Sequence, residues 1–226
     1  MFKRYAVYYT PEEGTPLAEF GAAWLGWNSA KGTTAQHPEA GGLDVAAITE
    51  TPRKYGFHGT IKPPFRLAEG ASVDDLQTAL ASLCTSEPVV TLTSLRLARL
   101  GRFLALVPSD DAKALGSLAA RAVRDLDPFR APQTHAELAK RRIARLTPAQ
   151  DAHLVKWGYP YVLDQFRFHL TLSGKLDRST ADRAEAALVR HLDGLTLEPY
   201  QITGLTLLGE DAKGMFHQIH RYALTG

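Results

Sequence analysis

The sequence predicts an α+β fold made of two lobes of one design. Two short strings, one around His58 and one around His169, share a pattern of aromatic residue, histidine, any residue, threonine and aliphatic residue. After each string comes a run with helical apolar periodicity, followed by two runs whose composition is typical of strands. The order strand–helix–strand–strand therefore occurs twice, and an internal repeat of this kind indicates two related lobes.

The elements before the first string are less regular. Residues 4–9 have the composition of a strand, and residues 16–27 place their apolar side chains on one helical stripe. Residues 28–52 are rich in Gly, Ala, Ser and Thr, which predicts a long connection with a short helix near residues 43–48. Because long loops inside a compact domain are often functional, this one is interpreted either as a lid or as an irregular connection.

The two lobes are predicted to contain matching sets of elements. In the first lobe we expect a helix over 72–84, strands over 89–97 and 103–107, and a helix over 109–126. In the second lobe we expect a helix over 179–192 and strands over 197–208 and 215–224. The chain is therefore interpreted as a single bilobal domain over 1–226, with lobes over about 1–126 and 162–226 whose terminal elements can exchange.

Residues 127–161 do not belong to the repeat, and they predict a helical insertion between the lobes. Two capping-box signatures, Thr134 with Glu137 and Thr147 with Gln150, indicate two short helices. The first of these helices carries a cluster of basic residues, namely Lys140, Arg141, Arg142 and Arg145. The cluster is interpreted either as a solvated helix face or as an anion-binding wall that caps a cleft.

Composition places the chain among ordinary globular proteins. Of its 226 residues, 45% are hydrophobic and 22% are charged, and the formal net charge of +2 is too small to indicate a nucleic-acid coat. Cys84 is the single cysteine, so no internal disulfide can form, and we expect its side chain to be buried. The N-terminus lacks a signal-peptide pattern, and no apolar run approaches the roughly 18 residues of a membrane span. These features predict a cytoplasmic protein without a membrane partner.

The two strings contain residues suited to proton transfer. Because side chains of a strand alternate between its faces, His58 shares a face with Thr60, and His169 shares a face with Thr171. If the two strings lie side by side, one imidazole can take a proton from an attacking oxygen while the other protonates a leaving oxygen. The threonine hydroxyls can donate hydrogen bonds to the non-bridging oxygens of a phosphoryl group. Lys62, two residues past Thr60, is expected on the same face, where it would add a positive charge.

Other candidate residues have weaker signals. Tyr55, Tyr161 and Arg167 flank the strings and are candidate substrate contacts, although such side chains also pack beside strands. His217 and His220 are three residues apart, so on a strand they face opposite ways and cannot easily bind one metal ion. We therefore expect no metal site and no cofactor. One such histidine alone would be interpreted as a half-buried strand residue, but the matched pair favours catalysis.

The paired strings resemble the 2H phosphoesterase superfamily, which includes 2′-5′ RNA ligase-like proteins and cyclic phosphodiesterases. The longer strings over 55–65 and 158–174 are similar to a narrower branch, the DUF1045 family, which is associated with phosphonate metabolism. The resemblance implies a bilobal 2H phosphoesterase-like fold with an antiparallel sheet in each lobe. It also implies a metal-independent phosphodiesterase with His58 and His169 as general acid and base. Thr60 and Thr171 would then be the phosphate ligands.

Three functions remain open on this evidence. The first is hydrolysis of a small cyclic sugar or nucleotide phosphate, and the narrower branch suggests a ribose cyclic phosphate from carbon–phosphorus bond cleavage. The second is the same chemistry on RNA ends, as a 2′,3′-cyclic phosphodiesterase or a 2′-5′ RNA ligase. The third is a module that binds nucleotides without turnover. A small-molecule site would be a pocket capped by the insertion, whereas an RNA site would be an open basic groove, which the near-neutral charge disfavours.

Overall fold

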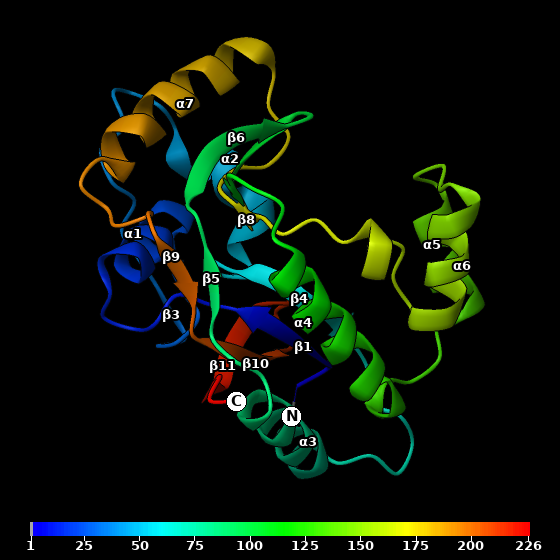
Figure 1. The fold of residues 1–226 in the computed structure, drawn as a ribbon. Coiled ribbons are helices and arrows are strands. Elements are labelled where there is room, and N and C mark those ends of the chain that lie inside the picture. The colour runs from blue at the N-terminus through cyan, green and yellow to red at the C-terminus, as the bar shows by residue number, and fades with distance from the viewer. Residues whose placement is uncertain (1) are drawn as a thin grey trace.

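The computed structural model describes residues 2–226, and it is organised around one seven-stranded antiparallel sheet (Figure 1). The strand order is β11-β10-β1-β4-β8-β7-β6. In chain order these strands are β1 (Arg4–Tyr9), β4 (Gly59–Phe65), β6 (Leu95–Leu100), β7 (Phe103–Pro108), β8 (Leu170–Thr171), β10 (Gly204–Glu210) and β11 (Phe216–Ala223). The predicted α+β fold with antiparallel strands is confirmed, and the strands expected as two sheets are continuous with each other.

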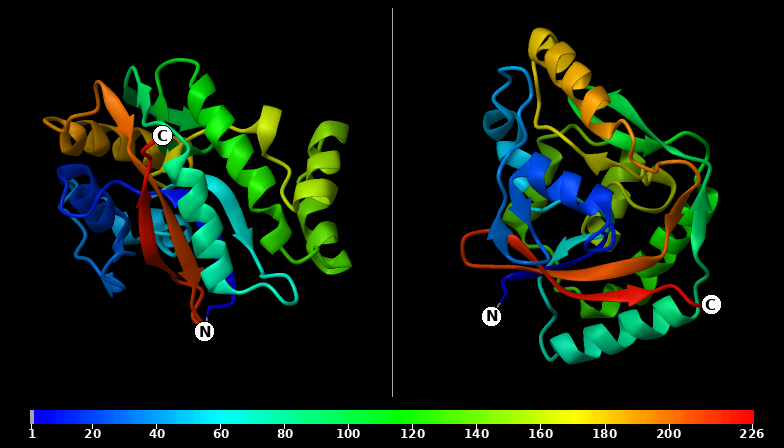
Figure 2. Two further views of the ribbon diagram at one scale, coloured as in Figure 1. Left: turned by 60° about the horizontal axis from the view of Figure 1, so that its bottom comes forward. Right: turned by 90° about the vertical axis from the view of Figure 1, so that its left-hand side faces the viewer.

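The strand order mixes early and late parts of the chain. The C-terminal hairpin β10–β11 pairs with β1, while β8 pairs with β4 on one side and with β7 on the other. Helix α3 lies against β10 and β11, as both views in Figure 2 show. The division into lobes over 1–126 and 162–226 remains a prediction.

Seven α-helices surround the sheet in the part of the chain from residue 2 to residue 226. They are α1 (Pro16–Leu25), α2 (Val45–Arg53), α3 (Val73–Thr85), α4 (Lys113–Asp125), α5 (His135–Arg142), α6 (Pro148–Trp157) and α7 (Arg178–Leu192). Two short 3-10 helices follow α4 and α6, namely η1 (Asp127–Phe129) and η2 (Leu163–Gln165). None of the helices described is long and apolar enough to cross a membrane.

The two faces of the sheet have different surroundings. In β1, Tyr5, Val7 and Tyr9 belong to the main core, to which α1, α2, α3, α4 and α7 all contribute. The alternating residues Ala6 and Tyr8 face the other way, into a much smaller apolar cluster. One face is therefore covered by helices, and the opposite face is left for a site.

Three expected elements differ in their limits. The predicted strand over 89–97 is two strands, β5 (Val90–Leu92) and β6, because β5 leaves the main sheet to pair with β9 (Tyr200–Ile202). The predicted strand over 197–208 is divided in the same way, between β9 and β10. The short helix expected near residues 43–48 is α2, which begins after its cap Asp44 and extends to Arg53. The rest of the long connection holds the small hairpin of β2 (Trp27–Asn28) and β3 (Thr33–Thr34).

The helical insertion is present as predicted. Helices α5 and α6 both begin with a complete capping box, at Thr134 and at Thr147. They pack against each other at one edge of the molecule (Figure 1). Arg66, just after β4, binds Glu137 at 3.1 Å, and Lys62 of β4 lies 3.6 Å from Asp127, so ion pairs connect the insertion to the sheet at its root.

The middle of the sheet depends on a single residue pair between β4 and β8. Gly59 lies opposite Leu170, and β8 is only two residues long. A Cβ atom on Gly59 would lie 2.3 Å from Cε2 of Phe168, whose buried ring packs near Tyr9. A side chain at position 59 would therefore push the two strands apart, so the close approach requires glycine.

We predict that Gly59→Ala lowers the free energy of unfolding by about 1–3 kcal/mol, because the added methyl group overpacks the ring of Phe168. Urea denaturation followed by circular dichroism measures this. Gly116→Ala is the matched control, since a Cβ on Gly116 in α4 meets no atom within 4 Å and alanine is the better helix former. Equal stability of Gly59→Ala and the wild type would contradict the packing argument.

Candidate active site

The pair between Gly59 and Leu170 brings both predicted strings together. When this antiparallel register is extended by one residue each way, His58 lies opposite Thr171, and Thr60 lies opposite His169. Opposed residues have Cβ atoms about 4.5–5.5 Å apart, and diagonal neighbours such as the two histidines are about 7–8 Å apart. The histidines were expected within the strands, but each lies one residue before its strand begins.

Both imidazoles are held by the same kind of hydrogen bond. Nδ1 of His58 lies 2.9 Å from the carbonyl oxygen of Gly56, and Nδ1 of His169 lies 2.8 Å from that of Arg167. Because a carbonyl only accepts, each Nδ1 carries the proton, and Nε2 is the basic atom in the neutral ring. In His58 this atom lies 3.3 Å from Oγ1 of Thr60. The two imidazoles are thus anchored in the same way, each through Nδ1.

The surroundings of His58 favour its neutral form. Its ring stacks on the fully buried ring of Tyr8, with centroids 3.9 Å apart, and Tyr55 lies at 5.8 Å. Burial lowers the pKa of His58 to about 4, although the hydrogen bond to Gly56 opposes this change. A positive charge on His169 lowers the pKa further, because the two rings are near each other. His58 is therefore an unprotonated base at neutral pH.

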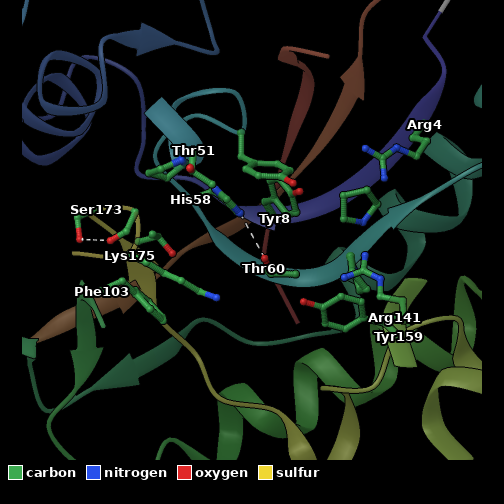
Figure 3. A pocket seen from close by; sticks show the side chains of 16 residues that line it. Arg4, Tyr8, Thr51, His58, Thr60, Phe103, Arg141, Tyr159, Ser173 and Lys175 are labelled. Atoms are coloured by element: carbon green, nitrogen blue, oxygen red, sulfur yellow. Dashed lines mark hydrogen bonds between the residues drawn. The ribbon is translucent and has the colours of Figure 1, made fainter. Parts of the chain in front are cut away.

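A pocket of about 310 Å³ opens beside this group (Figure 3). Of the predicted site residues, it is lined by His58, Thr60, Thr171 and Tyr55. His169 does not line the pocket. Its ring lies 5.7 Å from the ring of Phe103, and Phe103 does line the pocket. Among residues 2–226, no three His, Cys, Asp or Glu side chains are grouped in a way that could bind a metal ion.

Lys62 is not in the pocket, and the expectation that it shares the face of Thr60 is wrong. Thr60 lies opposite Tyr8 and Lys62 lies opposite Val7, so Ile61 is an extra residue, a β-bulge. The bulge turns Lys62 to the side of the core. Its side chain is 2% exposed, and Nζ donates to the carbonyl of Val123 at 3.0 Å and lies 3.6 Å from Asp127. Burial lowers the pKa of Lys62 to about 8, with Asp127 opposing the change.

Two other predicted contacts also lie outside the pocket. Tyr161 is 43% exposed and packs edge-on against Tyr159, with centroids 5.7 Å apart. Arg167 is exposed, and its Nη1 donates to the carbonyls of Phe166 and Asp164. Of the two tyrosines, Tyr159 lines the pocket and Tyr161 does not, because the turn after α6 directs Tyr159 inward.

The cations of the pocket are Arg4, Arg141 and Lys175, and its lining includes no carboxylate. Only Arg141 had been noted in the sequence, as part of the basic cluster of the insertion. Lys175 lies four residues past Thr171, and backbone hydrogen bonds hold the chain on both sides of it. Gly174 N–H donates to Ile48 at 2.7 Å, and Leu176 N–H donates to Arg102 at 2.7 Å. In Figure 3 the amine of Lys175 extends into the pocket.

Fold and site together define an α+β protein in which two histidine–threonine strings meet at the centre of an antiparallel sheet, beside a cation-lined pocket. The chain belongs to the family described as "Protein of unknown function (DUF1045)", which matches residues 60–217. Membership of this family, which the two long strings predict, is confirmed.

Two curated relatives are both described as "Ribose 1,5-bisphosphate phosphokinase PhnN". The protein from Janthinobacterium sp. (strain Marseille) is 37% identical over 218 residues, which cover 93% of this chain and 48% of the relative. The protein from Laribacter hongkongensis (strain HLHK9) is 32% identical over 219 residues, which cover 96% of this chain and 51% of the relative. The chain therefore spans about half the length of these relatives.

Solved structures with a similar arrangement are more distant. One is described as a phosphoesterase (14% identity, TM-score 0.42) and covers 100% of both chains. Another is E. coli LigT complexed with 3′-AMP (17% identity, TM-score 0.42), again over 100% of both chains. Similarity at this level supports no argument about chemistry, which has to come from the residues of this chain.

We predict that His58 titrates near pH 4, because its partly buried position, stacked on Tyr8, disfavours the imidazolium. NMR titration of protein labelled at histidine, with the signal assigned by its loss in His58→Gln, measures this value. Nitrogen shifts of the same ring should report the tautomer protonated at Nδ1. A midpoint near the ordinary value of about 6.5 would contradict the proposed environment.

Proposed function

We propose that this chain is a phosphodiesterase that hydrolyses a small cyclic phosphodiester by general acid–base catalysis. The observation that supports it most is the pairing of Gly59 with Leu170, from which the diagonal positions of His58 and His169 across the two strands follow. Two imidazoles anchored through Nδ1 on diagonal positions, which are about 7–8 Å apart in such a pair, are suited to act on the two sides of a phosphoryl group.

His58 acts as the base, because the fold keeps it neutral. Its Nε2 accepts a proton from water while the water oxygen forms a bond to phosphorus. The bond between phosphorus and the leaving ring oxygen breaks, and His169, which enters the step as the imidazolium, donates its Nε2 proton to that oxygen and becomes neutral. One water molecule is consumed, and a phosphomonoester with a free hydroxyl results.

The charge that develops on the non-bridging oxygens needs donors. Thr60 and Thr171 line the pocket from the two strings, and Lys175 reaches it from the segment after β8. Hydroxyl donors and a cation that are already in place stabilise such a transition state without reorganisation. In this assignment Lys175 has the role expected of Lys62.

The relatives suggest the substrate. Their printed name concerns ribose 1,5-bisphosphate, and this chain matches about half of their length. Hydrolysis of the 1,2-cyclic phosphate of ribose 5-phosphate, with O2 as the leaving atom, yields ribose 1,5-bisphosphate. We infer that this half prepares the sugar phosphate on which the rest of the relatives acts, which agrees with the expected ribose cyclic phosphate.

The form of the pocket favours a small substrate over an RNA end. Its volume of about 310 Å³ is at the low end for small-molecule sites, and Arg141 and Tyr159 of the insertion bound it on one side. Turnover of RNA 2′,3′-cyclic ends or 2′-5′ ligation in preference to ribose cyclic phosphates would instead establish a function on RNA ends. Binding of nucleotides without turnover would establish a binding module.

We predict that His58→Gln and His169→Gln each lower kcat by on the order of 10²–10⁴-fold, because each removes one proton transfer. Steady-state hydrolysis of the 1,2-cyclic phosphate of ribose 5-phosphate, without added metal, measures this. Circular dichroism should show that both variants remain folded.

His220→Gln is the control, since His220 is exposed on β11 and outside the pocket. It should retain wild-type kcat. Activity should also persist in a chelator, because protons are transferred by imidazoles. Full activity of either active-site variant would remove that histidine from the mechanism, and loss of activity in the chelator would refute metal independence.

Lys175 and Lys62 provide a further test. We predict that Lys175→Gln lowers kcat by roughly ten- to a hundredfold, because a charge-assisted contact to the transition state is lost, with little change in stability. Lys62→Met should have the reverse effect, with kcat retained and the free energy of unfolding lowered by about 1–3 kcal/mol, because the carbonyl of Val123 loses its donor. Steady-state kinetics and urea denaturation of both variants show which of the two lysines contacts the transition state and which one stabilises the fold. A normal kcat for Lys175→Gln would refute its role.

A further inference from the structure

The pocket has more room and more charge than one cyclic phosphodiester requires. Its 310 Å³ is the volume of about ten water molecules. Figure 3 shows Lys175 at the end near His58, and Arg4, Arg141 and Tyr159 toward the other end. The cations are thus divided between two ends of one pocket, and none of the residues that line it is acidic.

Arg141 is the cation at the far end that is left without an acidic partner. Its guanidinium lies 4.8 Å above the centre of the Tyr159 ring, and this stacking orients the planar group. Within residues 2–226 Arg141 makes no salt bridge, whereas the neighbouring Arg142 is held by two hydrogen bonds to Asp151, at 2.7 and 3.0 Å. Arg141 is therefore available to an anionic ligand.

The other two residues at this end differ from Arg141. Arg4 is bound through two nitrogens to the carboxylate of Glu210, at 2.5 and 2.8 Å, so its charge is compensated. The hydroxyl of Tyr159 points into the pocket in Figure 3. Burial raises the pKa of Tyr159, with Arg141 opposing the change, so the hydroxyl remains protonated and can donate. A fork of N–H groups and an O–H donor thus converge on one place.

We propose that Arg141 and Tyr159 form a second subsite, which binds a phosphomonoester at the end of the substrate away from the phosphodiester being cleaved. This inference rests on the proposed function and narrows it: the substrate is a sugar that carries a cyclic phosphodiester and a separate terminal phosphate. The planar fork of Arg141 suits two phosphate oxygens, and the hydroxyl of Tyr159 suits a third. The helical insertion then sets specificity, while the sheet performs the chemistry.

Binding without turnover is the first test. Ribose 5-phosphate and ribose differ only in the terminal phosphate, and neither contains a phosphodiester. By calorimetry, Arg141→Gln should weaken binding of ribose 5-phosphate by roughly ten- to a hundredfold and leave that of ribose unchanged. Lys140→Gln, in the same exposed helix but outside the pocket lining, should behave as the wild type. Arg141→Lys should be intermediate, because it keeps the charge but not the fork.

Kinetics provide the second test, with the 1,2-cyclic phosphates of ribose 5-phosphate and of ribose as substrates. Arg141→Gln should lower kcat/KM for the phosphorylated substrate by roughly ten- to a hundredfold, chiefly through KM, and should not change it for the other. The ratio of the two values in each variant isolates recognition of the terminal phosphate from the chemical step.

The outcomes separate the two proposals. Equal binding of ribose 5-phosphate and ribose by the wild type, or equal binding of ribose 5-phosphate by wild type and Arg141→Gln, overturns the subsite. Hydrolysis of both cyclic substrates with the same effect of Arg141→Gln on each also overturns it, and leaves the phosphodiesterase standing. Binding of ribose 5-phosphate that depends on Arg141, with neither cyclic substrate hydrolysed, supports the subsite and overturns the proposed reaction. If Arg141→Gln does not fold, Arg141→Lys decides by the same ratios.

Discussion

The contact between β4 and β8 at Gly59 and Leu170 is the constraint on which the rest of the site depends. An antiparallel pair has a local two-fold axis between its strands, so two strings of the same pattern centred on these residues become equivalent. That equivalence is visible in the anchors of the two imidazoles, each a carbonyl two residues earlier in the chain. Because Gly59 has no side chain, the ring of Phe168 can pack against its backbone, and the two strands can pair at this position.

Equivalent backbones do not give equivalent histidines. His58 is stacked on Tyr8 and has its pKa lowered by burial, whereas the ring of His169 lies 5.7 Å from that of Phe103 and does not line the pocket. The cations are also unequal, since a bulge turns Lys62 into the core after the first string while Lys175 reaches the pocket after the second. The difference between the two histidines thus has its physical origin in what packs around each string.

Residue patterns within one element were predictable, and geometry that depends on a partner strand was not. Alternation placed His58 with Thr60, and the repeat of the string identified its counterpart. The same alternation failed at Lys62, because the bulge exists only in the pairing of β4 with β1. The sequence also pointed to Tyr161, whereas Tyr159 lines the pocket, because the orientation of both side chains follows from the turn after α6. Basic residues in the insertion were noticed, but only the fold selects Arg141 among them.

The buried Lys62 connects the two functions assigned to this molecule. Its ammonium group and the guanidinium of Arg130 share the carboxylate of Asp127, at the root of the insertion. Because Lys62 is two residues from Thr60, this network connects the strand that follows His58 to the root of the insertion that carries Arg141. A lysine turned away from the pocket thus helps to fix the distance between the place where a phosphodiester would be cleaved and the place where a second phosphate would be bound.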